Sequence, residues 1–328
     1  MNKDVSWKLF FEDNERVADF ISCMALGASN QIDEKDIADA DGQLSMMVRL
    51  RDKWLKLNKQ RDVVKKIVLR TTVLIADIES QELVDYSYPL RELGYIYGEY
   101  EGQARRIKRK NRRLRINRAA GEKLYNYNKN DKLNPAVVFL LYSGKEAWDG
   151  PRSLHDMLNM EGIPENFKSL IMNHKINIIN IRELTVEQLD KFKTDVGKVF
   201  ACIKYSEDKD QLLNLVKSDE YFTNMDQDAA EVLATYISDS RIIDRVEKTE
   251  EGKVDMCKAI DDLIADGREL GREEGISIGE SRGESRGIIE GQRLILIAQV
   301  KDGVLTIDKA AKYANMTEDE FQKLLNTK

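Results

Sequence analysis

The stretch RDVVKKIVLRTTVLIADIESQ, residues 61–81, decides the fold of this chain. Its first half is rich in β-branched Val and Ile, and TTVLIADI at 71–78 forms a second apolar run. Two such runs so close together predict a hairpin of two β-strands over 62–80, with its turn near Leu69–Thr71. The other elements can be placed around this hairpin.

Helical patterns flank the hairpin on both sides. Apolar residues at steps of three and four predict an opening helix over 9–27. The same spacing over 33–57 indicates another helical face or a substantial insertion. Pro89 suits the first turn of a helix, and helical periodicity resumes there as far as Tyr100.

Two further strands follow in the sequence. AVVFLLY at 136–142 is a continuous apolar run, typical of a strand buried on both faces. INIINI at 176–181 predicts another strand, and the capping box from Thr185 to Gln188 predicts a helix through about Tyr205. This order predicts an α/β fold in which a small mixed sheet is flanked by helices.

Composition limits the class of protein. The 328 residues suggest about two domains, and 42% hydrophobic with 34% charged residues is typical of a helix-rich, charge-covered protein. Three widely separated cysteines fit a reducing compartment. The N-terminus turns acidic where a signal peptide needs apolar residues, and no uncharged apolar stretch is as long as 18 residues. We therefore expect a cytoplasmic protein with no membrane partner.

Few kinds of catalytic group are available. The sequence has no P-loop, no dinucleotide-binding glycine motif and only two histidines, so its chemistry has to come from carboxylates. Alternate residues of a strand share a face, so Asp77, Glu79 and Gln81 project together, and Asp62 begins the neighbouring strand. Carboxylates without histidine favour Mg²⁺ or Mn²⁺, which also bind phosphate oxygens. On spacing alone, a purely structural role for these residues stays open.

A basic segment, ARRIKRKNRRLRINR at 104–118, has nine basic residues and no acidic one in a chain of net charge −6. This density favours a polyphosphate partner, and the absence of aromatic residues favours phosphate contact over base stacking. The alternative is a solvated basic helix or loop without a partner. Arg91 is a further candidate for phosphate, or for a salt bridge with a nearby acid. The candidate DNA contacts in the segment are Arg105, Arg106, Lys108, Arg109, Lys110, Arg112 and Arg113.

Three stretches carry a family resemblance: RDVVKK at 61–66, LIADIESQELVDYSYPLRELGYIYGEYEGQ at 74–103 and LNPAVVFLLYSGKEAWDGPRSLHDML at 133–158. They resemble the recombination-promoting nuclease and putative transposase family of the PD-(D/E)xK nuclease superfamily. INIINIREL at 176–184 and MCKAIDDLIADGRELGREEG at 256–275 fit later segments of that family. The resemblance implies a nuclease-like core and a DNA endonuclease dependent on Mg²⁺ or Mn²⁺. The role that it implies is recombination, transposon-like mobility or phage defence.

The resemblance also implies a role for each site residue. Asp62 and Glu79 match the metal-binding carboxylates, and Gln81 takes the superfamily's lysine position, where it would orient water or phosphate. Asp77 stands where the family has glycine, either as an extra metal ligand or as a charge that raises a neighbour's pKa. Ile96 stands where the family has aspartate. These departures keep open an alternative, a catalytically worn nuclease fold that binds DNA or assembles without cutting.

The C-terminal quarter has a different pattern. Glycine recurs at every fourth position from Gly267 to Gly291. At about 1 kcal/mol each, seven glycines disfavour an isolated helix, so the segment is either a helix packed in a homo-oligomer or a flexible charged tether, which we narrowly favour. Two short helices are expected over 306–314 and 317–325. The expected divisions are a nuclease-like domain 1–215, a helical segment 216–262, the glycine segment 263–293 and a helical element 294–328.

Overall fold

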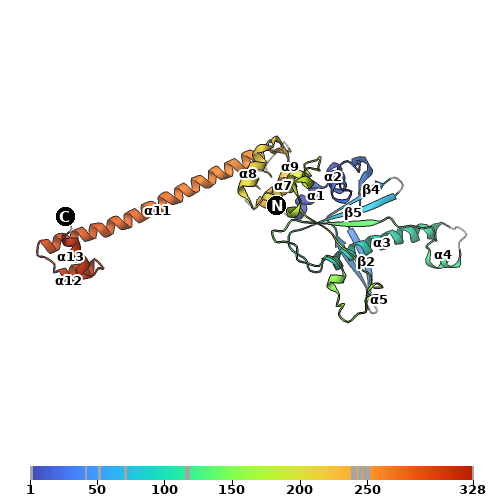
Figure 1. Cartoon of the computed structure of the whole chain (residues 1–328), viewed down its shortest axis with the longest axis horizontal. Helices are drawn as coiled ribbons and strands as arrows, with labels where there is room; N and C mark the ends of the chain where they lie inside the picture. Colours follow the sequence, from blue (N-terminus) through green and yellow to red (C-terminus); the bar gives the residue numbers. More distant parts are fainter. Residues whose placement is uncertain are drawn as a thin grey trace. The chain divides into compact units, whose positions relative to one another are not determined.

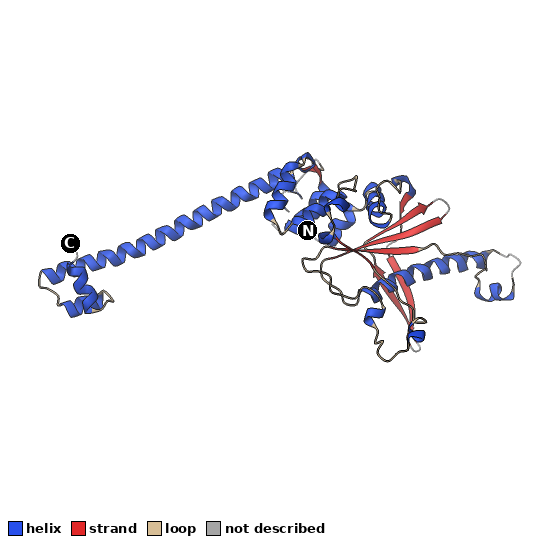
Figure 2. Cartoon of the chain, in the orientation of Figure 1, coloured by secondary structure: helices blue, strands red, loops and turns tan. Residues whose placement is uncertain are grey.

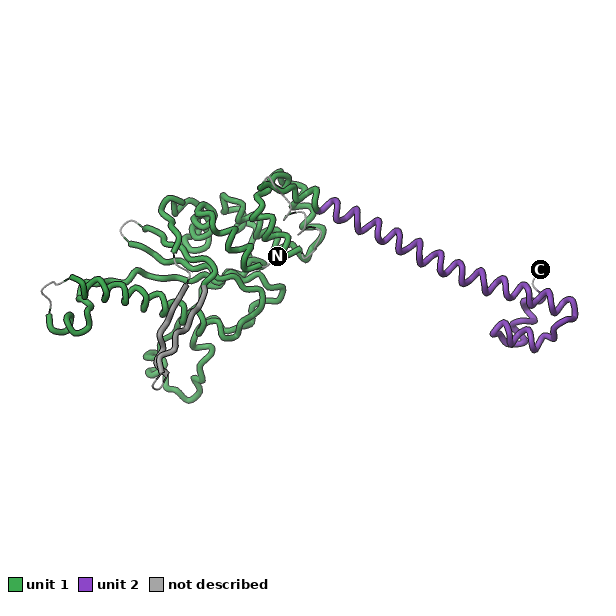
Figure 3. Tube along the Cα trace, turned by 180° about the vertical axis from the view of Figure 1, so that it is seen from behind, with its two compact units in different colours: residues 1–259 green, residues 260–328 purple. Residues whose placement is uncertain are grey.

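The computed structural model describes most of the chain, which divides into two compact units, residues 1–259 and 260–328 (Figure 3). The first unit mixes helices and strands, whereas the second is helical (Figure 2). For residues 43–50 and 53–60 only the backbone is described. The described residues are 3–40, 43–50, 53–69, 72–114, 119–237, Ile242, Val246 and 252–326.

A five-stranded mixed sheet forms the centre of the first unit, in the order β1-β4-β5-β6-β7 (Figure 2). The three strands β1, β4 and β5 are antiparallel, whereas β5, β6 and β7 run parallel. Their bounds are β1 Ile37–Asp39, β4 Val63–Leu69, β5 Thr72–Gln81, β6 Ala136–Tyr142 and β7 Asn177–Asn180. The mixed α/β class is therefore confirmed.

The hairpin predicted from residues 62–80 is confirmed as β4 and β5, which pair from Val63 with Ile78 to Leu69 with Thr72. Residues 70 and 71 of its turn lie outside the described part. The predicted strands at 136–142 and 176–181 are confirmed as β6 and β7, the second being shorter because Ile181 begins a 3-10 turn.

Helices cover both faces of this sheet (Figure 1). On one face, Phe20 of α2 packs against Phe139 of β6 and Phe200 of α7, with ring centroids 5.8 and 6.2 Å apart. On the other face, Tyr88 at the start of α3 packs against Leu140 of β6. The helices concerned are α1 (Lys3–Phe10), α2 (Asn14–Ala25), α3 (Tyr88–Arg113), α7 (Val196–Tyr205) and α9 (Gln227–Ile237).

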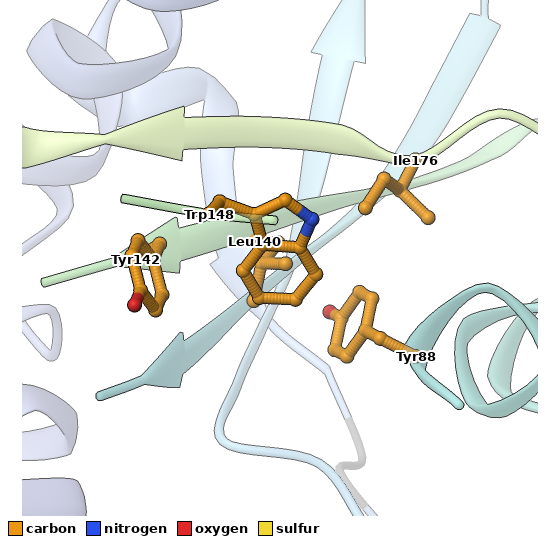
Figure 4. Packing of buried hydrophobic residues seen from close by; sticks show 5 residues of the cluster. All are labelled: Tyr88, Leu140, Tyr142, Trp148 and Ile176. Carbon is orange, nitrogen blue, oxygen red and sulfur yellow. The ribbon is translucent and has the colours of Figure 1, made fainter. Parts of the chain in front are cut away.

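An apolar cluster anchors the start of α3 on the sheet (Figure 4). Tyr88, Leu140 and Tyr142 are almost fully buried, and Trp148 meets Tyr142 edge-on with ring centroids 5.1 Å apart. Ile176 closes the cluster. Pro89 occupies the first turn of α3, as predicted, and sets where the helix begins. The apolar cluster sets where that end of the helix packs on the sheet.

The single opening helix predicted over 9–27 is wrong, because the structure has two helices, α1 and α2. The Asp13 side chain caps α2 by accepting a hydrogen bond of 2.8 Å from the Glu15 backbone N–H. The break therefore follows from a local capping signal, Asp13-Asn14, that the apolar spacing concealed.

The helical face predicted over 33–57 is also wrong. After the 3-10 turn η1 (Glu34–Asp36) and β1, the backbone forms an antiparallel hairpin of β2 (Gln43–Leu50) and β3 (Lys53–Gln60). The sequence also contains a two-residue alternation, Leu44, Met46, Val48 and Leu50. That strand signal competed with the helical spacing, and strand pairing decided between them.

The single helix predicted from Thr185 to about Tyr205 is wrong, because the structure has two helices there, α6 (Val186–Leu189) and α7. The capping box is confirmed, because Thr185 and Gln188 exchange backbone-to-side-chain hydrogen bonds of 2.9 and 3.2 Å. The interruption is a tertiary effect: Asp19 accepts hydrogen bonds of 2.7 and 2.8 Å from the backbone N–H groups of Lys193 and Thr194.

Short elements complete the first unit. The helices are α4 (Ala120–Tyr125), α5 (Glu165–Lys168), α8 (Lys209–Ser218), η2 (His155–Met157), η3 (Ile181–Glu183) and η4 (Glu220–Thr223), and the strands β8 (Met225–Asp226) and β9 (Lys253–Val254) pair. None of the helices in the described part of the chain has the length and apolar composition that a membrane crossing needs.

The second unit contains most of α11 (Met256–Lys301), followed by α12 (Ile307–Tyr313) and α13 (Glu318–Asn326). The glycine row lies inside α11, so the favoured expectation of a flexible tether is wrong for its local conformation. No described atom outside the helix lies within 4 Å of a Cβ built at any of these glycines. The two predicted short helices are confirmed, and their core contains Ala310, Ala311 and Phe321.

Candidate metal and phosphate site

Asp62 and Glu79 face each other where β4 and β5 end their pairing. The Asp62 backbone N–H donates a hydrogen bond of 3.1 Å to Glu79 Oε1, and the Ser80 backbone N–H donates one of 3.1 Å to Asp62 Oδ2. These reciprocal bonds fix both carboxylates at the strand end. Burial raises the pKa of Glu79 to about 7, and the Asp62 charge adds to the rise. The structure thus brings together the two residues that the sequence paired.

Asp77 lies two residues before Glu79 on the same face of β5 and is only 1% exposed. Among the described residues, none donates a hydrogen bond to either of its carboxylate oxygens, and its ion pair is a distant one, 3.7 Å from Oδ2 to Arg61 Nε. Burial, with the charge of Glu79, raises its pKa well above the ordinary value. A buried carboxylate in this state is costly unless a cation or a proton compensates it.

Glu92 of α3 adds a fourth carboxylate that the sequence did not indicate. It is fully buried, and its Oε1 lies 3.0 Å from His174 Nε2, whereas its Oε2 accepts no hydrogen bond within the described part of the chain. Burial, with the charge of Glu79, raises the pKa of Glu92 to about 8. Burial lowers the pKa of His174. A contact across 82 residues leaves no local signal, which is why both residues were missed.

Arg61, adjacent to Asp62, links the site to the middle of α3. Besides Asp77, its guanidinium binds Glu99 Oε2 at 3.1 Å, and the other oxygen of Glu99 accepts hydrogen bonds of 3.2 Å from Gln103 and 3.4 Å from Arg106. This network, buried at Arg61 and Glu99 and exposed at Arg106, connects the carboxylate cluster with the first residues of the basic segment.

Lys8 is a further residue that the sequence did not indicate. It lies on α1, and its Nζ is 3.4 Å from Asp62 Oδ1, with its side chain 32% exposed. The N-terminal helix therefore contributes a cation to the end of the β4–β5 hairpin, 54 positions away along the chain.

Gln81 and Arg91 stand next to these carboxylates. Gln81 is the last residue of β5, half-buried, and its carbonyl oxygen accepts a hydrogen bond of 3.0 Å from the Ser143 backbone N–H. Arg91 forms the salt bridge that the sequence allowed, 2.9 Å from NH1 to Asp85 Oδ2. It still lies near enough to Glu79 to oppose the rise in that residue's pKa.

The basic segment forms the second half of α3 up to Arg113, and residues 115–118 lie outside the described part. Arg105 and Arg106 are held by Glu101 and Glu99. The remaining candidate contacts are all exposed: Lys108, Arg109, Lys110, Arg112 and Arg113. The alternative of a loop is excluded for 104–113, whereas both a DNA-binding helix and a solvated one remain open.

The residues fit a divalent cation in number and kind. Within the described ranges, no group of three or more His, Cys, Asp or Glu side chains is arranged to hold a metal ion. Mg²⁺ requires only one or two carboxylates, because water and substrate phosphate oxygens complete its octahedron. Asp62 and Glu79 meet that requirement, and the unbonded oxygens of Asp77 indicate negative charge in excess of the cations nearby.

Comparison of this chain with models of protein families, with curated proteins and with solved structures finds no match.

Proposed function

We propose that this chain is a metal-dependent DNA endonuclease of the recombination-promoting nuclease and putative transposase type, built on a PD-(D/E)xK nuclease-like core. One observation carries the proposal. Asp62 and Glu79 hold each other at the strand end beside Asp77, a buried carboxylate that accepts no hydrogen bond from any residue that the structure describes. Structural carboxylates are normally paired, whereas sites for a cation leave such charge uncompensated.

In this proposal Asp62 and Glu79 hold a Mg²⁺ or Mn²⁺ ion. When bound, the cation activates water and offsets the charge of the phosphate. The oxygen of the attacking water bonds to phosphorus while the bond to the leaving oxygen breaks. The leaving oxygen takes up a proton while the attacking water loses one, so the products are a phosphomonoester and a hydroxyl end. Gln81 orients the water or the phosphate by hydrogen bonding.

The exposed half of α3 supplies DNA affinity. Five exposed basic residues follow one another within Lys108–Arg113, and each can neutralise a backbone phosphate and release a counterion. The network from Arg106 through Glu99 to Arg61 connects this half of the helix with the carboxylate cluster. DNA held along α3 would therefore lie on the element that also carries Glu92.

Cleavage of supercoiled plasmid tests the function. We expect nicking that depends on Mg²⁺ or Mn²⁺ and falls by about 10³-fold in Glu79→Gln, because loss of several kcal/mol of charge stabilisation corresponds to that factor. Glu82→Gln is the matched control, since Glu82 follows shortly along the chain but is exposed and ion-paired with Lys3. A plasmid that stays supercoiled while the protein retains DNA would instead support the worn, non-cutting alternative.

The salt dependence of DNA binding tests the basic helix separately. Replacing Arg109, Lys110, Arg112 and Arg113 by alanine should reduce the slope of log K against log[salt] by about one per lost phosphate contact. Lys209→Ala, at the exposed start of α8, should leave the slope unchanged. An unaltered slope in the quadruple variant would assign the segment to solvent.

A further inference from the structure

Strand β5, which carries Glu79 and Gln81, contributes no positively charged side chain to the proposed site. Phosphodiester hydrolysis concentrates negative charge on the phosphate oxygens, and active sites offset that charge with cations and preorganised donors. Gln81, at the end of β5, can donate a hydrogen bond but carries no charge. A cation from another element is therefore required beside Asp62 and Glu79 if the site is to stabilise the transition state beyond what the metal provides.

Two arginines near the carboxylates are already engaged. Arg61 is 3% exposed and is shared between Asp77 and Glu99. Arg91 Nη1 is bound to Asp85 at 2.9 Å and the guanidinium stacks 4.7 Å above the ring of Tyr88, whereas its Nε and Nη2 are buried without a hydrogen-bond partner among the described residues. Moving either guanidinium to a substrate would break an ion pair and leave a carboxylate uncompensated.

Lys8 is placed differently. Its neighbour Trp7 is 2% exposed and donates a hydrogen bond of 3.1 Å to Tyr236, and Phe10 is fully buried, so α1 is held firmly against the unit. From this rigid base the Lys8 ammonium lies 3.4 Å from Asp62 Oδ1. Charge-assisted hydrogen bonds are typically about 2.7–2.9 Å long, so this contact is loose. The side chain remains 32% exposed and can be reached by a substrate.

We propose that Lys8 is a catalytic cation of this site, which binds a non-bridging oxygen of the scissile phosphate and replaces the charge that Gln81 lacks. This inference rests on the proposed endonuclease function. It assigns to the N-terminal helix a direct part in the chemistry, because α1 sets the position of the ammonium and the hairpin sets the position of the carboxylates. Lysine suits the role, since its flexible stem lets a compact charge follow the phosphate.

Charge relocation provides the sharpest test. Lys8→Gln should lower the cleavage rate by about 10²-fold, the usual cost of one transition-state donor. Adding Gln81→Lys to that variant should recover at least tenfold, because the charge returns from the neighbouring strand, whereas a lost packing contact would not be restored there. Lys8→Arg should retain more activity than Lys8→Gln.

Lys3→Gln is the matched control on the same helix, because Lys3 binds Glu82 at 2.5 Å and lies over the ring of Tyr236. It should cut within about threefold of the wild type, well short of the effect of removing a transition-state donor. Calorimetric Mn²⁺ binding supplies a readout besides cleavage. Lys8→Gln should bind Mn²⁺ at least as tightly as the wild type, since a competing cation has left Asp62, whereas Asp62→Ala should bind it more weakly.

The outcomes separate the two proposals. A wild-type protein that cuts no DNA with Mg²⁺ or Mn²⁺ removes both. If the wild type cuts DNA and Lys8→Gln cuts it at the same rate, only the proposed role of Lys8 is overturned. A slow Lys8→Gln that Gln81→Lys does not rescue, or that loses Mn²⁺ binding, shows that Lys8 merely supports the shape of the site and overturns the inference.

Discussion

Two buried ionic clusters of the first unit differ in how fully their charged groups are paired. Arg16 of α2 is 4% exposed and donates hydrogen bonds of 2.7 and 2.8 Å to both oxygens of Asp195, and it also binds Asp228. Tyr221 donates a further bond of 2.7 Å to Asp195. Burial lowers the pKa of Arg16, but the hydrogen bonds to Asp228 and Asp195 outweigh burial and raise it overall.

The cluster at the β4–β5 end is uncompensated by comparison. Asp77 and Glu92 are as deeply buried as Arg16, yet three of their four oxygens accept no hydrogen bond from the residues that the structure describes. In the proposed function, the compensated cluster serves the fold and the uncompensated one serves chemistry, because unpaired buried charge is retained where a ligand will meet it. Stability measurements can test this distinction directly.

The largest effect should come from breaking the compensated cluster. Arg16→Leu would leave Asp195 buried among partners without its cation, and we expect a loss of about 3–5 kcal/mol in the free energy of unfolding. Urea denaturation at neutral pH measures it. Lys35→Leu, which removes an exposed ion pair with Asp33, should change stability by less than about 1 kcal/mol. Equal effects of the two substitutions would contradict the distinction.

The pH dependence of stability should reveal the uncompensated cluster. The pKa of Glu79 is raised to about 7 and that of Glu92 to about 8, so the folded protein holds these protons more tightly than the unfolded chain. Their stabilising contribution is therefore present below about pH 4.5 and is lost as the pH rises to 7–8. For Glu79 alone it amounts to about 3 kcal/mol.

Thermal unfolding without divalent ions should thus show Glu92→Gln gaining stability over the wild type at pH 8 but not at pH 5. Mg²⁺ should reduce that advantage, because a bound cation stabilises the ionised wild-type site. A variant that is less stable than the wild type at both pH values would show that the Glu92–His174 pair is structural.

Asp77→Asn should give a smaller gain, about 1–2 kcal/mol at pH 8, because it removes a buried charge that no hydrogen bond satisfies. Asp210→Asn is the matched control, since Asp210 is an exposed residue in the first turn of α8. Guanidinium denaturation of both variants tests this prediction. Destabilisation of Asp77→Asn would indicate that the ion pair with Arg61 is worth more than its length of 3.7 Å implies.

The smallest effect lies in the second unit, where charge is exposed and packing is absent around the glycine row. Gly279→Ala and Gly283→Ala should each stabilise α11 by about 0.5–1 kcal/mol, because the added Cβ meets open space. Circular dichroism during thermal unfolding measures the change. Reduced helicity or an altered sedimentation coefficient would show instead that the glycines contact a second chain.

Elements with local signals could be predicted from the amino-acid sequence. β-Branched apolar runs specified the β4–β5 hairpin, Pro89 specified the start of α3, and the capping box at Thr185 specified a helix start. Such signals survive because they depend on residues within one turn or one strand. The juxtaposition of Asp62 with Glu79 followed from the hairpin alone.

Which distant residues meet at that hairpin depends on how the whole unit packs. Lys8, Glu92 and His174 reach the site from other elements, and their spacing in the chain contains no information about that encounter. Contact with Asp19 likewise interrupted a helix that its own sequence would have continued. In each case, the hydrophobic periodicity of a segment indicates which face it buries. The partner of that face depends on how the whole unit packs.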